Sequence, residues 1–252
     1  MVTHVYRRKS NTTMGNLYRL AFYLWRRMPG SLQAVFIKSA VGKGLKIAGR
    51  DLLARFAGRE DLYSAEYYSY VDAEASRSAP FIVASVLSQF APRRLIDVGC
   101  GTGALLAEFN SRGVSGFGLE YSAAGLKTCR KRGLNVDTFD IESDERLDLG
   151  EFDLAICFEV AEHVQARFAD RLVDLLVRFA PRVIFTAATP EQGGGADHVN
   201  EQPHKYWIAR FEQRGYRMLW EITEQWRHDW SQKDVAAFYA RNVMIFEKSG
   251  VT

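Results

Sequence analysis

The chain has 252 residues, of which 47% are hydrophobic and 25% are charged. These proportions are ordinary for a globular protein and exclude a disordered chain, a collagen-like fibre and a small disulfide-rich scaffold. No apolar run approaches the roughly 18 residues that a membrane-spanning helix requires. The N-terminus shows no apolar segment followed by a small-residue cleavage site, so we expect no signal peptide.

The net charge of +3 conceals two chemically different parts. Residues 1–60 carry 12 Lys and Arg against two acidic residues, a net charge of +10. The other 192 residues carry 21 Lys and Arg against 28 acidic residues, a net charge of −7. This shift predicts a basic extension over residues 1–60 and a separate domain over residues 61–252.

Two segments of the extension have the spacing of amphipathic helices. Residues 17–28 repeat apolar side chains at intervals of three and four, with arginines between them, until Pro29 and Gly30 end the pattern. Residues 45–56 repeat this arrangement with a second basic side. Both segments are therefore expected to be helices with one apolar and one basic face.

Three roles are open for this extension. Its apolar stripes can pack on the main domain. Alternatively, the helices can lie in the surface of an anionic membrane, which an apolar stripe, a basic face and Trp25 suit. Nucleic-acid binding is disfavoured because no recognition motif accompanies the positive charge.

From residue 80 onward, strand and helix patterns alternate. Strands are expected over residues 93–98, 116–120, 134–140, 152–158, 183–187, 216–223 and 243–248. Helices are expected over residues 104–111, 123–132, 164–179 and 203–214. Repeated βα units predict an α/β fold with a doubly wound, mostly parallel sheet of seven strands. Ligands of such sheets lie beyond the carboxyl ends of the strands.

A glycine-rich loop of sequence Asp-Val-Gly-Cys-Gly-Thr-Gly, residues 97–103, follows the first of these strands. Its glycine spacing differs from the G-x-G-x-x-G of dinucleotide-binding proteins. Asp97 would repel a pyrophosphate but suits a ligand that carries an amino group. Glu120 ends the next strand, where a carboxylate can hold the two hydroxyls of a ribose.

At these positions the sequence resembles the class I S-adenosylmethionine-dependent methyltransferases, over about residues 60–250. The resemblance implies the Rossmann-like methyltransferase fold, with S-adenosylmethionine as cofactor and a small-molecule O-methyltransferase-like activity. It implies that the loop holds the methionine part, that Glu120 holds the ribose, and that later motifs lie beside the adenine and around the fourth strand. The cofactor-binding residues that it implies are Asp97, Gly99, Cys100, Gly101, Gly103, Glu120, Tyr121, Asp140, Ile141, Phe158 and Glu159.

His163 and His198 are the candidate catalytic residues, because they follow the fourth and fifth strands, whose ends are adjacent in this fold. Either can act as general base for an acceptor hydroxyl. Alternatively, Glu159, Glu162, His163 and His198 can bind a divalent metal. The spacing predicts that Glu159, Glu162 and His163 share one helical face. The same motif also occurs in metal-free relatives, where it caps a helix and lines the cofactor, so a metal is not expected.

Residues 220–239, between the last two predicted strands, can shape an acceptor pocket or form a simple hydrophobic cover. The whole pattern predicts methyl transfer to a small, lipid-linked or sugar-linked acceptor, on oxygen in preference to nitrogen or carbon. A non-catalytic scaffold and an N-methyltransferase are the alternatives. Three cysteines, Cys100, Cys129 and Cys157, cannot all pair and fall in the predicted core. The expected location is therefore the cytoplasm, with peripheral contact at the inner membrane surface as a further expectation.

Overall fold

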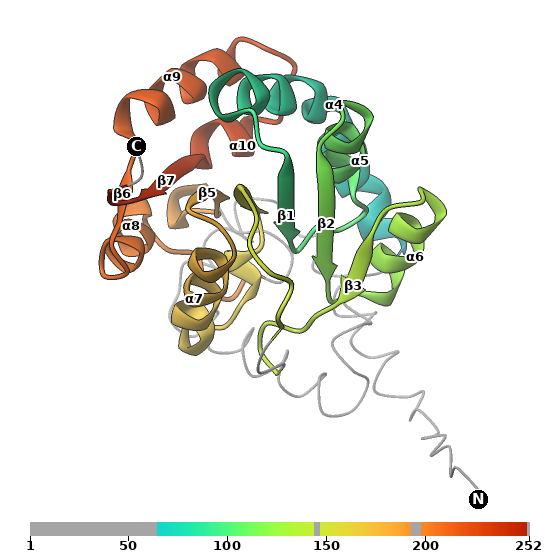
Figure 1. The fold of residues 1–252 in the computed structure, drawn as a ribbon, viewed down its shortest axis with the longest axis horizontal. Helices are drawn as coiled ribbons and strands as arrows, with labels where there is room; N and C mark the ends of the chain where they lie inside the picture. Colours follow the sequence, from blue (N-terminus) through green and yellow to red (C-terminus); the bar gives the residue numbers. More distant parts are fainter. Residues whose placement is uncertain (1–64, 144–146, 193–197, 251–252) are drawn as a thin grey trace, which may run out of the picture. The chain divides into compact units, whose positions relative to one another are not determined.

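The computed structural model describes residues 65–143, 147–192 and 198–250 (Figure 1). The predicted extension over residues 1–60 lies outside the described residues. Its two helices, its boundary with the domain and its contact with an anionic membrane therefore remain predictions. No helix in the described ranges is long and apolar enough to cross a bilayer.

A single seven-stranded sheet forms the centre of the described domain, in the order β3-β2-β1-β4-β5-β7-β6. The strands are β1 Arg94–Val98, β2 Ser115–Glu120, β3 Val136–Thr138, β4 Leu154–Phe158, β5 Arg182–Thr186, β6 Tyr216–Met218 and β7 Met244–Lys248. β7 runs antiparallel to β5 and β6, whereas the other pairings are parallel. This arrangement confirms the predicted doubly wound, mostly parallel sheet.

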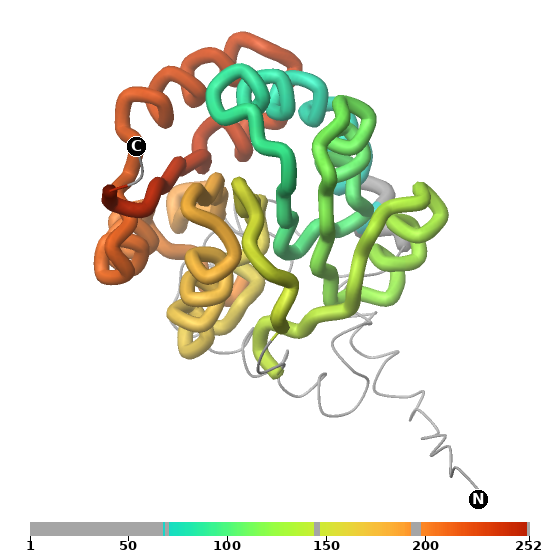
Figure 2. The backbone as a smooth tube through the Cα atoms, viewed as in Figure 1, coloured from blue at the N-terminus to red at the C-terminus, as the bar shows by residue number. Residues whose placement is uncertain are grey.

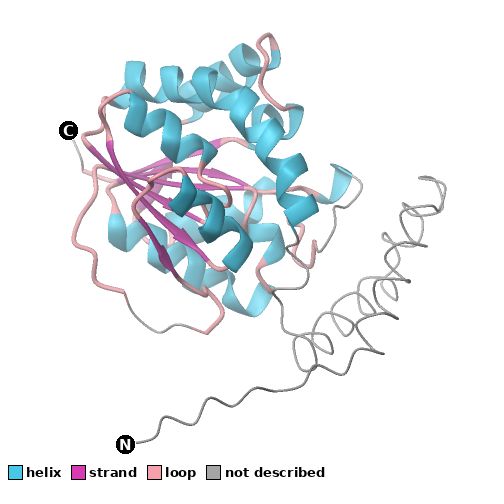
Figure 3. Ribbon diagram, turned by 90° about the vertical axis from the view of Figure 1, so that its right-hand side faces the viewer, coloured by secondary structure: helices cyan, strands magenta, loops and turns pink. Residues whose placement is uncertain are grey.

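Helices cover both faces of the sheet (Figure 3). They are α4 Ala65–Phe90, α5 Ala104–Ser111, α6 Ala123–Lys131, α7 Ala169–Phe179, α8 His204–Glu212, α9 Trp220–Ser231 and α10 Ala237–Asn242. α4, α5, α9 and α10 supply the core on one face, and α7 and α8 supply it on the other. The backbone trace in Figure 2 shows α4 and α9, far apart in sequence, running side by side on their common face.

β4 shows how the alternation of side chains along a strand produces these two cores. All five of its residues are buried. Ala155 and Cys157 point into the core beneath α7 and α8, while Leu154, Ile156 and Phe158 point into the core beneath α4, α9 and α10. A strand buried on both faces reads as a continuous apolar run, as this segment does.

The expected strand over residues 216–223 is wrong in its second half. β6 ends at Met218, and α9 begins at Trp220. The pairing with β7 stops after the Leu219 N–H donates to the carbonyl oxygen of Ile245, at 2.8 Å. Beyond it, the spacing of Thr223, Trp226 and Trp230 places three buried side chains on one helical face.

Two other expected elements are shorter than the sequence pattern suggests. The helix predicted over residues 164–179 begins at Ala169, after a 3-10 turn at Ala166–Phe168. The strand predicted over residues 134–140 is paired only at Val136–Thr138, because β3 is an edge strand whose sole neighbour is β2. Element ends are the least certain part of any such prediction, since terminal pairing depends on tertiary neighbours.

Trp230 joins two helices of one face. Its side chain is fully buried, and its indole Nε1–H donates to Ser85 Oγ of α4 at 3.0 Å. A second hydrogen bond to α4 comes from the residue just before α10, where the Ala236 N–H donates to Ser78 Oγ at 2.9 Å. α9 is therefore fixed to α4 by both packing and hydrogen bonding.

We expect Trp230→Ala to lower the free energy of unfolding by about 3–5 kcal/mol, because it leaves a large cavity and removes the hydrogen bond to Ser85. Trp220→Ala is the matched control, since Trp220 is 56% exposed. Its effect should stay within about 0.5 kcal/mol. Urea unfolding of both variants measures the difference, and equal stabilities would contradict the assigned packing.

Candidate functional site

The glycine loop joins β1 to α5 beside the point where the strand order reverses, with β2 on one side of β1 and β4 on the other. Gly99, Gly101 and Gly103 have φ values of 79°, 57° and 76°, in the left-handed region that favours glycine. A Cβ atom on Gly99 would lie 2.4 Å from Val160, and one on Gly103 would lie 2.3 Å from Leu134. The loop therefore requires glycine for both its conformation and its packing.

The same loop is bound to the neighbouring strand. The N–H groups of Gly99 and Cys100 donate to the Leu119 carbonyl oxygen, at 2.7 and 3.0 Å. Beneath it, the Cys100 and Cys129 sulfur atoms lie 3.9 Å apart, and both thiols are buried and free. The Cys129 thiol donates to the Gly101 carbonyl oxygen at 3.3 Å. These contacts give the loop a defined shape.

Two buried carboxylates flank this loop. Asp97 is 3% exposed on β1, and Glu120 is 6% exposed at the end of β2. Burial raises the pKa of Asp97 to about 8, with a further contribution from the negative charge of Glu120. Burial also raises the pKa of Glu120, although hydrogen bonds from Ser122 and Gly101 offset part of the shift. Neither acid forms an ion pair with a residue that the structure describes, and such a pair of acids suits a ligand that brings a positive charge.

Glu120 also organises the backbone around it. Its Oε2 accepts from the Gly101 N–H at 2.8 Å, and its Oε1 accepts from the Ser122 N–H at 2.7 Å. The hydroxyl of Tyr68, on α4, donates to Oε1 at 3.2 Å. Tyr68 thus covers the carboxylate predicted to hold a ribose.

The residues predicted to lie beside an adenine follow β2 and β3. Tyr121 directly follows Glu120, and the Phe139 N–H donates to the Glu120 carbonyl oxygen at 3.1 Å, which brings Asp140 to the same sheet edge. Asp140 accepts from the Glu142 N–H at 2.9 Å, so its carboxylate shapes the turn after β3. Ile141 is partly buried against the core.

At the end of β4, Glu159 leaves the strand in an unusual conformation. Its φ is 52°, which is rare for a residue other than glycine. The prediction that Glu159, Glu162 and His163 share one helical face is therefore wrong, because the 3-10 helix there spans only Ala161–His163. Phe158, just before it, is buried and packs edge-on against Tyr239 with ring centroids 5.5 Å apart.

His163 and His198 lie together beyond β4 and β5, as their positions in the sequence predicted. Their ring centroids are 4.9 Å apart at an interplanar angle of 86°. The Glu162 carbonyl oxygen accepts the N–H groups of Val199 and Asn200, at 2.8 and 2.9 Å, and this fixes the segment carrying His198. His198 Nδ1 lies 2.9 Å from Glu201 Oε1.

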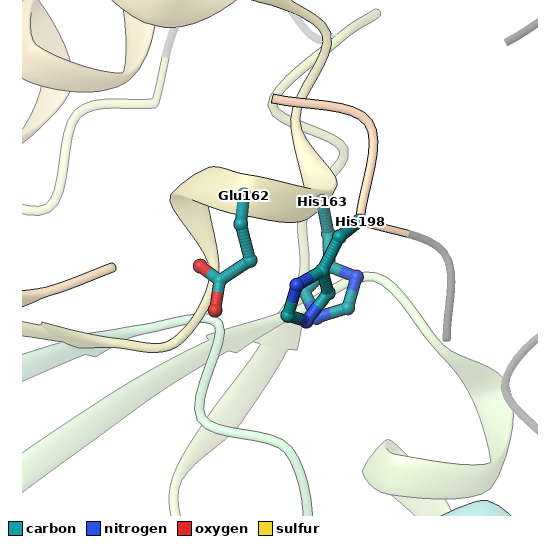
Figure 4. A group of neighbouring side chains, drawn as sticks. All are labelled: Glu162, His163 and His198. Atoms are coloured by element: carbon teal, nitrogen blue, oxygen red, sulfur yellow. The ribbon is translucent and has the colours of Figure 1, made fainter. Parts of the chain in front are cut away.

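Glu162 completes a cluster of three side chains (Figure 4). One ligand atom from each of Glu162, His163 and His198 lies within 4.8 Å of the other two. Glu162 is fully buried, and within the described residues neither of its carboxylate oxygens has a donor in ordinary hydrogen-bond geometry. Burial, followed by the charge of Glu159, raises the pKa of Glu162 well above its usual range. One carboxylate and two imidazoles fit a divalent cation, which would also satisfy the orphaned oxygens.

Comparisons with known proteins agree with this geometry. Residues 82–193 match the family "Methionine biosynthesis protein MetW". The chain is 30% identical over 157 residues to the ubiquinone biosynthesis O-methyltransferase of Alkalilimnicola ehrlichii. The matched segment covers 60% of this chain and 58% of that protein. It is 29% identical over 173 residues to the enzyme of the same name from Nitrobacter winogradskyi, covering 66% and 62% respectively.

The chain thus resembles S-adenosylmethionine-dependent methyltransferases over part of its length, and both curated relatives are O-methyltransferases by name. The predicted resemblance is thereby confirmed, although the chain spans only about three fifths of the length of these curated relatives. DesVI of Streptomyces venezuelae has the same fold, with a TM-score of 0.53, 17% identity, and coverage of 70% of this chain and 92% of DesVI. Its similarity supports the methyltransferase fold alone.

Two residues of this site could not be assigned from the sequence. Thr186, at the end of β5, accepts the Glu159 N–H with its hydroxyl at 2.8 Å. Asn242, the last residue of α10, donates to Glu159 Oε1 at 3.0 Å. Neither residue lies in a recognisable sequence motif. Asn242 also belongs to the segment after β6, and the sequence pattern assigns the start of that segment, residues 219–223, to a strand.

Asp97→Asn should stabilise the ligand-free domain at alkaline pH. The pKa of Asp97 in the folded state, about 8, lies above its ordinary value of 3.8. Its contribution to stability is therefore complete below about pH 4 and is lost as the pH rises through about 8. Asparagine resembles the protonated acid, so this loss should disappear, and Tm at alkaline pH should rise by roughly 2–4 °C for each kcal/mol of burial cost removed.

Calorimetric melting between about pH 5 and about pH 9 tests this dependence. Asp137→Asn, on an exposed position of β3, is the matched control and should keep the parent profile. An Asp97→Asn profile that falls as steeply as the parent would contradict the assigned burial effect.

Proposed function

We propose that this protein transfers a methyl group from S-adenosylmethionine to a small, lipid-linked or sugar-linked acceptor, on an oxygen atom. The observation that carries the proposal is the pair of buried carboxylates, Asp97 and Glu120, on either side of the glycine loop. S-adenosylmethionine offers each of them a partner: an ammonium group for Asp97 and a ribose diol for Glu120. The tight loop between them suits the methionine part.

Bound S-adenosylmethionine supplies an electrophilic methyl group: the carbon–sulfur bond breaks as the carbon–oxygen bond forms, and S-adenosylhomocysteine keeps the electron pair. The chain holds the acceptor in line with that methyl group, and such positioning supplies much of the acceleration. The acceptor hydroxyl must also lose its proton. We assign the role of general base to His163 or His198, whose rings lie 4.9 Å apart beyond β4 and β5.

His198 has a partner that suits this role. A proton on Nδ1 can be donated to Glu201 Oε1, 2.9 Å away, which leaves Nε2 as the basic nitrogen. Glu201 would then orient the ring and stabilise its charged form after proton transfer. An oxygen acceptor also agrees with the names of both relatives, which are O-methyltransferases.

Glu120→Ala should weaken the binding of S-adenosylmethionine roughly ten- to a hundredfold, because a charge-assisted hydrogen bond is lost. Titration calorimetry measures the dissociation constant. Glu151→Ala is the control, since Glu151 is an exposed acid just before β4, at the opposite end of the sheet from the loop. Equal affinity of the two variants would contradict the assigned pocket.

Methyl transfer itself is tested with S-adenosylmethionine labelled in its methyl group and a small-molecule extract of the source cells. A labelled product, lost in Glu120→Ala at low cofactor concentration and restored at high concentration, supports the proposal. A protein that binds the cofactor but labels no molecule in the extract would instead support a non-catalytic scaffold. Label found on nitrogen would contradict the assignment to oxygen.

The orphaned carboxylate of Glu162 favours a second role for the histidines. Glu162, His163 and His198 would hold a divalent cation, which would orient the acceptor oxygen and lower the pKa of its hydroxyl. In that case the histidines are ligands and not bases. Mg²⁺ and Mn²⁺ suit the carboxylate, and the imidazoles suit Mn²⁺ or Zn²⁺.

If a cation is bound, a chelator should abolish methyl transfer, and added Mg²⁺ or Mn²⁺ should restore it. Titration calorimetry with Mn²⁺ gives a readout independent of activity, and Glu162→Gln should remove the Mn²⁺ binding. His163→Ala and His198→Ala should both lower turnover more than cofactor affinity. Full activity in chelator together with no Mn²⁺ binding would leave the histidines as general bases.

A further inference from the structure

Asn242 is a fully buried polar residue at the end of α10, in the segment between β6 and β7. Its Nδ2 donates to Glu159 Oε1 at 3.0 Å and lies 3.3 Å from Gln192 Oε1. Gln192 in turn donates from Nε2 to Asn242 Oδ1. The side-chain amides of Asn242 and Gln192 therefore hydrogen-bond to each other, and the Nδ2 group of Asn242 also donates to the Glu159 carboxylate.

This pairing determines which way the Asn242 amide faces. A side-chain amide has a donor end and an acceptor end, and the acceptor end of Asn242 is occupied by Gln192. The donor end must then face Glu159, as a carboxylate requires. If the Asn242 amide were reversed, its Oδ1 would face Glu159 Oε1, and two acceptors would meet. Gln192 and Glu159 together therefore allow a single orientation of the Asn242 amide.

The backbone of Glu159 is held independently. Its N–H donates to Thr186 Oγ1 at 2.8 Å and lies 3.2 Å from the Thr186 carbonyl oxygen, which ties it to the end of β5. Its φ of 52° is a strained conformation for this residue, and such strain persists only where the surroundings enforce it. Thr186 fixes the main chain, and Asn242 fixes the side chain.

Glu159 also lies beside the cofactor loop, because the next residue, Val160, packs directly against Gly99. On its other side begins the turn that carries Glu162 and His163. In the proposed function, a carboxylate between the cofactor loop and the histidines is next to the path of the acceptor. A partly buried charge, held by two elements in a strained conformation, is costly for stability alone.

We propose that Asn242 is a positioning residue for methyl transfer, holding the Glu159 carboxylate so that it accepts a hydrogen bond from the acceptor. The inference rests on the proposed function. It specifies an acceptor that carries a hydrogen-bond donor, a hydroxyl or an ammonium group, next to the atom that is methylated. It also gives the segment between β6 and β7 a part in the acceptor site, beyond that of a hydrophobic cover.

Four proteins test this role: Asn242→Ala, Asn242→Asp, the double variant Glu159→Gln with Asn242→Asp, and the control Thr223→Val. The double variant exchanges donor and acceptor, so it keeps a hydrogen bond between the two side chains but moves the carboxylate to position 242. Thr223 is buried in α9, and its Oγ1 accepts the Ile245 N–H at 3.3 Å. Thr223→Val therefore removes a buried hydrogen bond from the same segment without touching Glu159.

Three quantities are measured for each protein: Tm, the dissociation constant for S-adenosylhomocysteine, and the rate of methyl transfer to the extract fraction that the unsubstituted protein labels. Asn242→Ala should keep the dissociation constant within about twofold and lose about ten- to a hundredfold in rate, the size of effect that a small misplacement produces. Thr223→Val should lose Tm but keep the rate. The double variant should recover Tm relative to Asn242→Asp without recovering the rate.

A double variant that recovers both Tm and rate would overturn the inference, because only the bond and not the position of the carboxylate would then matter. Asn242→Ala with the rate of Thr223→Val would overturn it as well. If the unsubstituted protein binds no cofactor or labels no fraction, the proposed function fails and the inference falls with it. If only the Asn242 variants behave like the parent, the proposed function stands and the inference alone fails.

Discussion

Asp97 and Glu120 bury two negative charges around one loop, and the architecture of the site follows from the need to accommodate them. Parallel pairing of β1 with β2 places both acids at the same edge of the sheet. The loop between them can supply N–H groups only if its backbone enters the left-handed region, which explains its glycines. Glu120 accepts hydrogen bonds from the loop N–H of Gly101 and from the N–H of Ser122, which offset part of the rise that burial causes in its pKa, whereas the pKa of Asp97 is raised to about 8. The free domain therefore carries an electrostatic cost that a cationic ligand would relieve.

The sheet divides the site into two chemically different halves. The glycines and acids that we assign to the cofactor follow β1, β2 and β3. Beyond β4 and β5 lie imidazoles, amides and the carboxylates of Glu159 and Glu162. Residues 161–163 form the junction, since the Glu162 main chain anchors the segment with His198 while its side chain joins both histidines. Cofactor recognition and acceptor chemistry thus belong to different strands.

The first half was largely predictable from the sequence because its signals are local. Gly103 and the apolar pattern after it place α5 at Ala104–Ser111, as observed. Asp97 is the second-last residue of β1 and Glu120 the last residue of β2, and short apolar runs define both strands. The second half depends on tertiary contacts between distant segments. Glu159 resembles the start of a helix in sequence, yet Thr186 draws its backbone into another conformation. Asn242 has no local signal, because its partners lie 50 and 83 positions away.

The position of β7 has a consequence for the order in which the molecule can assemble. β7 follows β6 in the chain but lies between β5 and β6 in the sheet, so β6 has no partner until β7 has been made. During synthesis the strands β1 to β5 can pair as they emerge, and N-terminal units generally fold first. The cofactor half can therefore form on the ribosome while α10 is still untranslated. Glu159 obtains its amide partner only in the closing step, which makes completion of the acceptor half one of the last events of folding.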